Sequence, residues 1–450
     1  MFKILLSIIA FSSCSISLPN LFEKLDRYLQ VHTDLGYFSG SVLVAQKDRI
    51  ILSKGYGMSN YEHNITNSPS IKFKLSSLAK PFTSLAIMQL QEKGFLQVTD
   101  TLAYYIPDFP NGDKIMIHHL LSHTSGIKNY TALADFHSFK RQPHSIIELI
   151  EHFKNLPLDF QPGTAYKFSN SNYVLLNYII SQVACMPFDE YIMQYILKRA
   201  GMSESGIEKQ QTIVAQRASG YTIFNRELLN SDFIDSSVII GLGSFYSTIE
   251  DMYLFNKALY SEKLANVQTL AALFTPYTYI GNPKDNIQYG YGWATIKYAG
   301  RTVKKHIGGI DGFSTAMYRF VEDEIFIIVL SNFQQVLAEP LSFDLAAIIF
   351  DQPYELPKKY SAITLDPKIY TQYVGHYAYK DLIYSISNKD NKLYFKQPDR
   401  PPYEILPLAI DEFFVLGLPI SITFKKDTQG QIESLVTKAF GKERTLKKKI

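Results

Sequence analysis

The sequence has little cysteine, little net charge and no recognisable cofactor motif. Cys14 and Cys185 are the only cysteines in 450 residues, so a fold held together by disulfides is excluded. The formal net charge is +3, and much of the basic excess lies in the tail KERTLKKK, which predicts a solvated end and no nucleic-acid partner. Neither a phosphate loop nor a dinucleotide fingerprint occurs, and we expect no cofactor. Cys185 lies in the apolar run YIISQVACMPF, which predicts a small core residue.

Long apolar runs are also missing beyond the N-terminus. The first residues, MFKILLSIIAFSSCSIS, combine an early lysine, an apolar run too short to span a bilayer and a small-residue region. This pattern predicts a signal peptide over residues 1–17 and an exported protein, either periplasmic or secreted. Lipidation at Cys14 is the one route to membrane attachment, although a leucine is expected where Phe11 stands. A buried first helix is the alternative interpretation.

Apolar and aromatic residues are abundant, at 46% and 14% of the chain, which predicts a large folded protein without long disordered tracts. Alternating runs around polar turns predict hairpins at 39–58 and at 301–332, and a mostly helical region lies between them. Strands at both ends with helices between predict one α+β domain over residues 18–355, whose antiparallel sheet joins the two ends.

The last part of the chain has a different pattern. A stretch rich in proline and polar residues, 351–367, predicts a linker. Beyond it, short alternating runs around Asn, Asp or Gly turns predict a small all-β barrel or sandwich over residues 356–450.

The tetrad Ser77-Leu78-Ala79-Lys80 at the start of an apolar helix is the first candidate for chemistry. Residues three apart share a helical face, so the lysine can reach the serine hydroxyl, take its proton when neutral or stabilise the alkoxide when charged. Without other evidence, Ser77 is equally well explained as a helix cap and Lys80 as a surface residue.

The histidines of HHLLSH raise the question of a metal. His119 and His123 are four residues apart, but no carboxylate completes a ligand set and the following residues form a turn. We therefore expect no metal, and a packing role for these side chains beneath the site.

Several segments in order along residues 37–350 resemble the serine β-lactamase and penicillin-binding-protein family, in its class C-like branch. The segments that carry the resemblance are FSGSVLVAQ, SKGYGMSNYEHN, IKFKLSSLAKPFTSLAIMQLQEKGFLQVTDTL, HHLLSHTSGI, PGTAYKFSNSNYVLLNYII, GLGSFYSTIEDMYLFNKAL with YGYGW, and HIGGIDGFST. The resemblance implies a β-lactamase/transpeptidase-like antiparallel sheet with a helical subdomain. The C-terminal part is similar to the lipocalin-like barrels appended to hydrolases of this family, which implies a role in shaping or covering the site.

The resemblance also implies roles for individual residues. Ser77 is the acylated nucleophile and Lys80 its general base or proton relay. His306 stands where the β-lactamases usually keep a lysine. A histidine at this position is more similar to the esterases, D-aminopeptidases and amidases, and the resemblance implies that it holds a carboxylate or amide of an extended substrate. The backbone N–H groups of Ser77 and Gly309 form the oxyanion hole. Gly308 allows a substrate to approach the strand closely.

The family's second motif, Tyr-x-Asn, is present only in part. The amide falls on Asn170, where it can bind both Lys80 and the substrate, but the aromatic position is Phe168, which has no hydroxyl to relay a proton. Three interpretations follow. Lys80 acts alone because burial makes it neutral, or the hydroxyl of Tyr166 or Tyr173 reaches the site, or the protein acylates slowly and mainly binds.

Two functions of different classes are consistent with these patterns. The first is an exported serine hydrolase that acts on an ester, an amide or a β-lactam, with D-amino-acid peptides of cell-wall type among its substrates. The second is a catalytically weak or inactive relative that binds cell-wall-like peptides. Either function implies a small-molecule or peptide partner.

Overall fold

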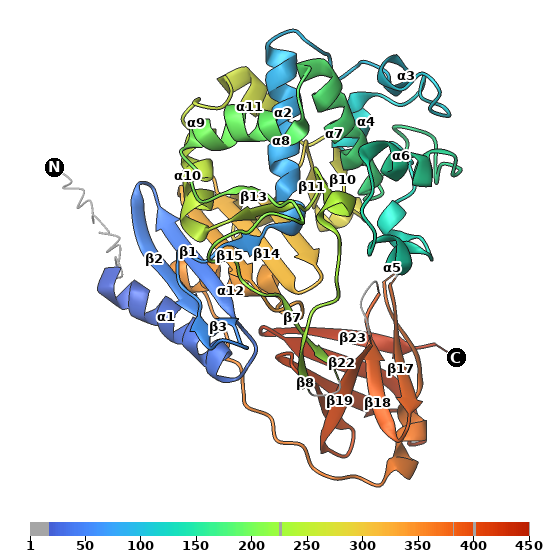
Figure 1. The fold of residues 1–450 in the computed structure, drawn as a ribbon. Helices are drawn as coiled ribbons and strands as arrows, with labels where there is room; N and C mark the ends of the chain where they lie inside the picture. The colour runs from blue at the N-terminus through green and yellow to red at the C-terminus, as the bar shows by residue number, and fades with distance from the viewer. Residues whose placement is uncertain (1–17, 225–226, 381, 399–401, 450) are drawn as a thin grey trace, which may run out of the picture.

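The structure is a computed structural model that describes residues 18–224, 227–380, 382–398 and 402–449. Figure 1 shows an α+β domain and a smaller β-barrel joined by an extended segment. The predicted signal peptide and Cys14 lie outside the described residues. Among the described residues, no helix combines the length and apolar character needed to cross a bilayer.

The α+β domain is built on one antiparallel sheet of eight strands, in the order β10-β11-β12-β13-β14-β15-β1-β2. The strands are β10 (Thr278–Tyr279), β11 (Gln288–Tyr289), β12 (Ala294–Tyr298), β13 (Arg301–Ile310), β14 (Phe313–Phe320), β15 (Ile325–Ser331), β1 (Gly40–Gln46) and β2 (Arg49–Tyr56). Both predicted hairpins are present. The register pairs Gly40 with Ser331, so the sheet joins the first and last parts of the domain as predicted.

Helices cover both faces of this sheet (Figure 1). On one face, α1 (Leu18–Asp34) and α12 (Ala338–Ile349) pack against a core that includes Val42, Val44 and Val329. On the other face, a larger core packs against the helical subdomain. Its helices are α2 (Lys80–Glu92), α3 (Leu102–Tyr105), α4 (Ile117–Leu121), α5 (Phe136–Phe139), α6 (Ile146–Lys154), α7 (Ser171–Ala184), α8 (Phe188–Ile192), α9 (Lys198–Ala200), α10 (Ile249–Leu259) and α11 (Val267–Phe274).

Helix α2 runs through the middle of the subdomain. All its residues from Lys80 to Leu90 are buried, including the polar Thr83, Ser84 and Gln89. Short strands complete the domain: β3 (Met58–Asn60), β4 (Ile65–Thr66), β5 (Phe73–Lys74), β6 (Gly206–Ile207), β7 (Tyr221–Phe224), β8 (Glu227–Asn230) and β9 (Phe245–Ser247).

One prediction about α7 is wrong. Cys185 is exposed, because it follows the last turn of the helix in a left-handed conformation with φ +50°. A residue in this conformation ends the helix, so Cys185 does not continue the buried face of α7 although the preceding sequence is apolar.

The C-terminal part is a closed barrel of eight strands in sequence order, closed by the pairing of Tyr377 with Lys448. The strands are β16 (Gly375–Tyr379), β17 (Leu382–Lys389), β18 (Lys392–Lys396), β19 (Pro402–Ala409), β20 (Glu412–Val415), β21 (Ile420–Lys426), β22 (Ile432–Ala439) and β23 (Lys442–Lys448). Aromatic and aliphatic side chains such as Tyr377, Phe395 and Phe424 fill its interior. Eight strands leave just enough room for such packing.

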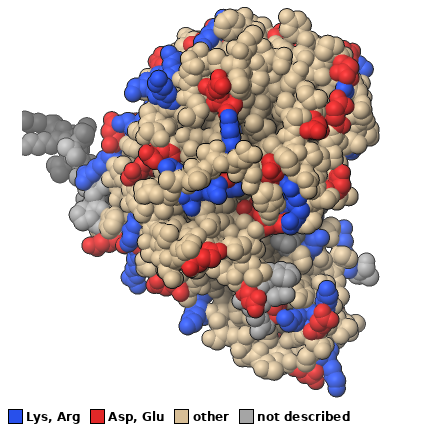
Figure 2. Space-filling view, viewed as in Figure 1, with Lys and Arg blue, Asp and Glu red and all other residues tan. Residues whose placement is uncertain are grey.

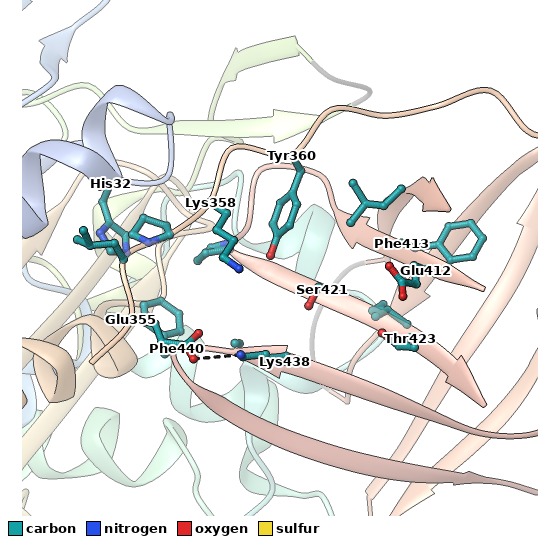
Figure 3. Close-up of a pocket in the computed structure, with 16 residues that line it drawn as sticks. His32, Glu355, Lys358, Tyr360, Glu412, Phe413, Ser421, Thr423, Lys438 and Phe440 are labelled. Carbon is teal, nitrogen blue, oxygen red and sulfur yellow. Dashed lines mark ion pairs between the residues drawn. The ribbon is translucent and has the colours of Figure 1, made fainter. Parts of the chain in front are cut away.

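The barrel contacts the first domain at separate points. Phe440 stacks on His32 of α1, and Lys380 pairs with Asp285 at 2.6 Å. A cavity of about 230 Å³ lies between the barrel wall, the linker and His32 of α1. Figure 3 shows the residues that line it, with Glu355 paired to Lys438. Ser77 and Lys80 do not line this cavity.

Candidate active site

Ser77 lies in a short 3-10 turn, Ser76–Ala79, that leads directly into α2. The turn is held against the sheet by a hydrogen bond of 2.9 Å from Thr315 Oγ1 to Leu75 O. Ser76 has φ +54° and is buried, so the backbone is strained immediately before the candidate nucleophile. The Ser77 hydroxyl makes no cap to the helix and instead lies 2.9 Å from Lys80 Nζ.

Lys80 has 0% of its surface exposed, so its interpretation as a surface residue is wrong. Its Nζ lies 2.9 Å from Ser77 Oγ and 2.9 Å from Asn170 Oδ1. The Phe168 and Tyr173 ring centroids lie 4.9 Å and 5.4 Å from the same nitrogen. Burial lowers the pKa of Lys80 from 10.5 to about 7 because the ammonium loses its hydration. At neutral pH a large fraction of Lys80 is therefore an amine that can accept a proton.

Phe168 occupies the side of Lys80 where the family motif implies a tyrosine. Its side chain is 38% exposed, so the ring borders solvent as well as Lys80. Tyr173 has its hydroxyl 3.0 Å from Ser84 Oγ and 3.2 Å from Leu121 O, beneath the site. Tyr166 packs its ring against His123 and Tyr289. The described hydrogen bonds of Lys80 Nζ thus go to Ser77 and Asn170, and not to a tyrosine.

Strand β13 brings the third motif beside the nucleophile. A Cβ at Gly308 would lie 2.5 Å from Thr315 Oγ1 and 2.8 Å from Leu75 O. The space beside Gly308 is therefore filled by the protein itself, and only a glycine fits at this position. A Cβ at Gly309 would meet nothing within 4 Å, so this residue borders open space as an oxyanion-hole residue requires.

His306 is buried and neutral. Its Nδ1 lies 2.8 Å from Ile307 O, a group that only accepts, so Nδ1 carries the proton and Nε2 accepts from the Tyr289 hydroxyl at 3.4 Å. Burial, with a smaller repulsion from Lys80, lowers the pKa of His306 to about 3. His306 therefore adds no positive charge to the site near neutral pH.

The floor of the site contains His123, as the packing interpretation predicts. His123 is fully buried, and its ring lies among those of Tyr166, Phe168, Tyr173 and Tyr289. Burial lowers the pKa of His123 well below its usual value. Among the residues that the structure describes, no group of three or more His, Cys, Asp or Glu side chains is arranged to hold a metal ion.

Sequence reasoning missed two sets of residues at the site. Asn129 and Thr131 contact Asn170 at 3.0 Å each, although about forty residues separate them along the chain. Lys140 pairs with Asp311 at 2.6 Å and with Asp232 at 2.9 Å, beside the third motif. Polar residues scattered over separate loops give no spacing signal that could have identified these groups.

Charge gives no further indication of a partner. Figure 2 shows Lys and Arg interspersed with Asp and Glu over the visible face, without an extended region of one sign. This distribution is typical of an ordinary solvated surface.

Comparison with known proteins identifies the family and agrees with the fold. The chain belongs to the beta-lactamase family, whose model matches residues 25–345. It is 30% identical over 433 residues to penicillin-binding protein 4* of Bacillus subtilis (strain 168), covering 90% of this chain and 93% of that protein. The fold is that of a β-lactamase-type serine hydrolase with an added barrel.

Solved structures give the same result for the fold. An octameric penicillin-binding protein homologue from Pyrococcus abyssi superposes with a TM-score of 0.68 at 21% identity, over 96% of this chain and 100% of the other. D-amino acid amidase from Ochrobactrum anthropi SV3 superposes with a TM-score of 0.65 at 19% identity, over 75% of this chain and 99% of the other. The first match extends over the barrel as well as the α+β domain.

Proposed function

We propose that this protein is a serine hydrolase that forms an acyl-enzyme on Ser77 and then hydrolyses it. The observation that carries the proposal is Lys80, which is fully buried, lies 2.9 Å from Ser77 Oγ and has a pKa lowered to about 7. A lysine with an ordinary pKa near 10.4 is almost entirely protonated at neutral pH and is a poor base. The environment of Lys80 removes that obstacle.

The proposed chemistry needs only groups of this chain and water. Lys80 takes the proton of the Ser77 hydroxyl as the oxygen attacks the substrate carbonyl. The backbone N–H groups of Ser77 and Gly309 stabilise the oxyanion. As the bond to the leaving group breaks, the Lys80 ammonium returns the proton to that group. Water then attacks the ester and transfers a proton to Lys80, which restores the serine hydroxyl.

The charges around the site favour a substrate without a carboxylate beside the scissile bond. His306 is neutral, with its pKa near 3. Lys140 is paired with Asp232 and Asp311, and Lys128 and Lys167 are both paired with Asp159. We propose amides or esters of D-amino acids, a class supported by the fold shared with D-amino acid amidase.

A catalytically weak, peptide-binding role is the second candidate. The observation in its favour is Phe168, which replaces a proton-relaying hydroxyl and can lower the rate by about 10² to 10⁴. In this case Ser77 acylates and the acyl-enzyme persists, because water is not activated.

Intact-mass spectrometry tests the proposal. The protein is incubated with a fluorophosphonate, with a D-amino-acid amide and with the matching free-acid dipeptide, and Ser77→Ala serves as the control. The hydrolase proposal predicts one adduct on wild type, none on Ser77→Ala, and turnover of the amide in preference to the acid. A stable adduct without turnover supports the binding role, and equal labelling of Ser77→Ala contradicts both.

We also propose that the protein is exported, on the basis of the N-terminal pattern. Fractionation of cells that express the full chain, with N-terminal sequencing of the product, tests this. Export predicts cleavage near residue 17, or a lipid on Cys14. An intact N-terminus in the cytoplasmic fraction contradicts it.

A further inference from the structure

A chain of hydrogen bonds fixes the orientation of the Asn170 side-chain amide, and the first donor in this chain is the backbone N–H of Asn170. The N–H of Asn170 can only donate, and it lies 3.0 Å from Asn129 Oδ1. Asn129 therefore presents its oxygen at this point. Thr131 Oγ1 lies 3.0 Å from the same oxygen, which can only accept, so the hydroxyl uses its single proton there.

The next bond follows from the same rule. Thr131 Oγ1 can only accept from the Asn170 amide, 3.0 Å away, so the side-chain nitrogen of Asn170 faces Thr131 and its oxygen faces Lys80. Lys80 Nζ lies 2.9 Å from that oxygen and must donate an N–H to it. A neutral amine has two N–H groups and one lone pair. With one N–H held by Asn170, the lone pair is available to the Ser77 hydroxyl at 2.9 Å.

We propose that Thr131, itself oriented by Asn129, is a positioning residue that sets the direction of proton transfer from Ser77 to Lys80. A reversed Asn170 amide presents an N–H to Lys80 and occupies the lone pair that the serine proton needs. Orientation through Asn170 matters especially here because Phe168 offers Lys80 no hydroxyl. The inference rests on the proposed function for its kinetic consequence, but the orientation itself follows from the contacts alone.

Thr131→Val tests this role because it keeps the branched shape and removes the hydroxyl. Without its acceptor, the Asn170 amide is free to reverse. We expect the plateau rate of Ser77 labelling at high pH to fall about tenfold to a hundredfold. We also expect the midpoint of the pH profile to move to lower pH, because a donor that faces Lys80 disfavours the ammonium.

Two controls separate orientation from general damage. Thr131→Ser keeps the hydroxyl and should restore both the rate and the midpoint. Thr371→Val removes a hydroxyl that lies 3.5 Å from the carbonyl oxygen of Lys368, in the 3-10 turn Pro367–Tyr373 before the barrel, and should change neither. The proposal is overturned if Thr131→Val lowers the plateau labelling rate but leaves the midpoint of the pH profile unmoved. It is also overturned if Thr131→Ser does not restore the labelling rate.

A second measurement keeps the inference separate from the proposed function. NMR titration of Lys80 in lysine-labelled protein, with Lys80→Met for assignment, reports the pKa of the amine without turnover. The orientation proposal predicts a lower pKa in Thr131→Val than in wild type and Thr131→Ser. An unchanged pKa overturns it even in an active enzyme. Absence of labelling in wild type, with the predicted pKa shift present, contradicts the proposed function and supports the orientation.

Discussion

At the scale of single residues, Lys80 is the side chain on which the chemistry depends. Its pKa of about 7 means that the amine gains its proton as pH falls through 7. In the unfolded chain the pKa is near 10.4. Between these values the unfolded state binds more protons than the folded state, so this residue makes stability rise with pH from about 7 to about 10. Below pH 7 its full destabilising effect is present.

Lys80→Met should therefore lose most activity and gain stability. Removal of a buried amine should raise the free energy of unfolding at pH 6.5 by about 2 to 4 kcal/mol, and the gain should shrink towards pH 10. Lys80→Arg should not restore activity, because a guanidinium cannot act as a base. Denaturation midpoints at pH 6.5, 8 and 9.5, read beside labelling rates, check both statements. A Met variant that is less stable at every pH, or an active Arg variant, contradicts them.

Phe168→Tyr tests whether the missing hydroxyl limits the enzyme. The ring already lies beside Lys80 and is 38% exposed, so one added oxygen should fit without loss of stability. If the hydroxyl relays a proton, acylation or deacylation should accelerate about tenfold to a hundredfold. Single-turnover kinetics with an ester substrate separate the two steps. No change in either step would show that Lys80 alone carries the proton.

At the scale of elements, the fit of β13 against the turn at Ser77 positions the site. Gly308→Ala places a methyl within 3 Å of Thr315 and Leu75, which should force the strand and turn apart. We expect a loss of about 1 to 3 kcal/mol in stability and most of the labelling rate. Gly309→Ala points into open space and should leave the denaturation midpoint unchanged while it slows acylation. Equal stability of the two variants contradicts this assignment.

Much of the arrangement of strands and helices was predictable from the sequence, for physical reasons. Alternation around a polar turn at Lys47-Asp48-Arg49 predicted the β1–β2 hairpin, although Arg49 already belongs to β2. Ser77 and Lys80 lie together because a spacing of three residues along a helical turn brings their side chains to one face. From the sequence, the burial of Lys80 was only one of several open interpretations, because it depends on α2 being surrounded by other helices. Asn129 and Thr131 were missed because they approach Asn170 only through tertiary packing. Cys185 was misplaced because a helix ended within an apolar run.

At the scale of the whole molecule, the barrel has its own core and contacts the first domain through side chains such as Phe440 and Lys380. Its buried side chains form one cluster of their own, and α12 ends at Ile349 well before β16 begins at Gly375. We expect limited proteolysis within 351–367 to release a soluble fragment close to residues 18–355. If this fragment aggregates or loses helical circular dichroism, the two parts depend on each other for folding and the boundary is wrong.

The most direct test of the account is the pH dependence of Ser77 labelling. The second-order rate constant for a fluorophosphonate, measured by intact mass from pH 5 to pH 9, should rise with a midpoint near 7, because the amine of Lys80 appears over that range. The rise should vanish in Lys80→Met, and no adduct should form in Ser77→Ala. A rate that is flat from pH 5 to pH 9, or one that rises only near the ordinary pKa of lysine at about 10, would show that Lys80 is not the base that activates Ser77.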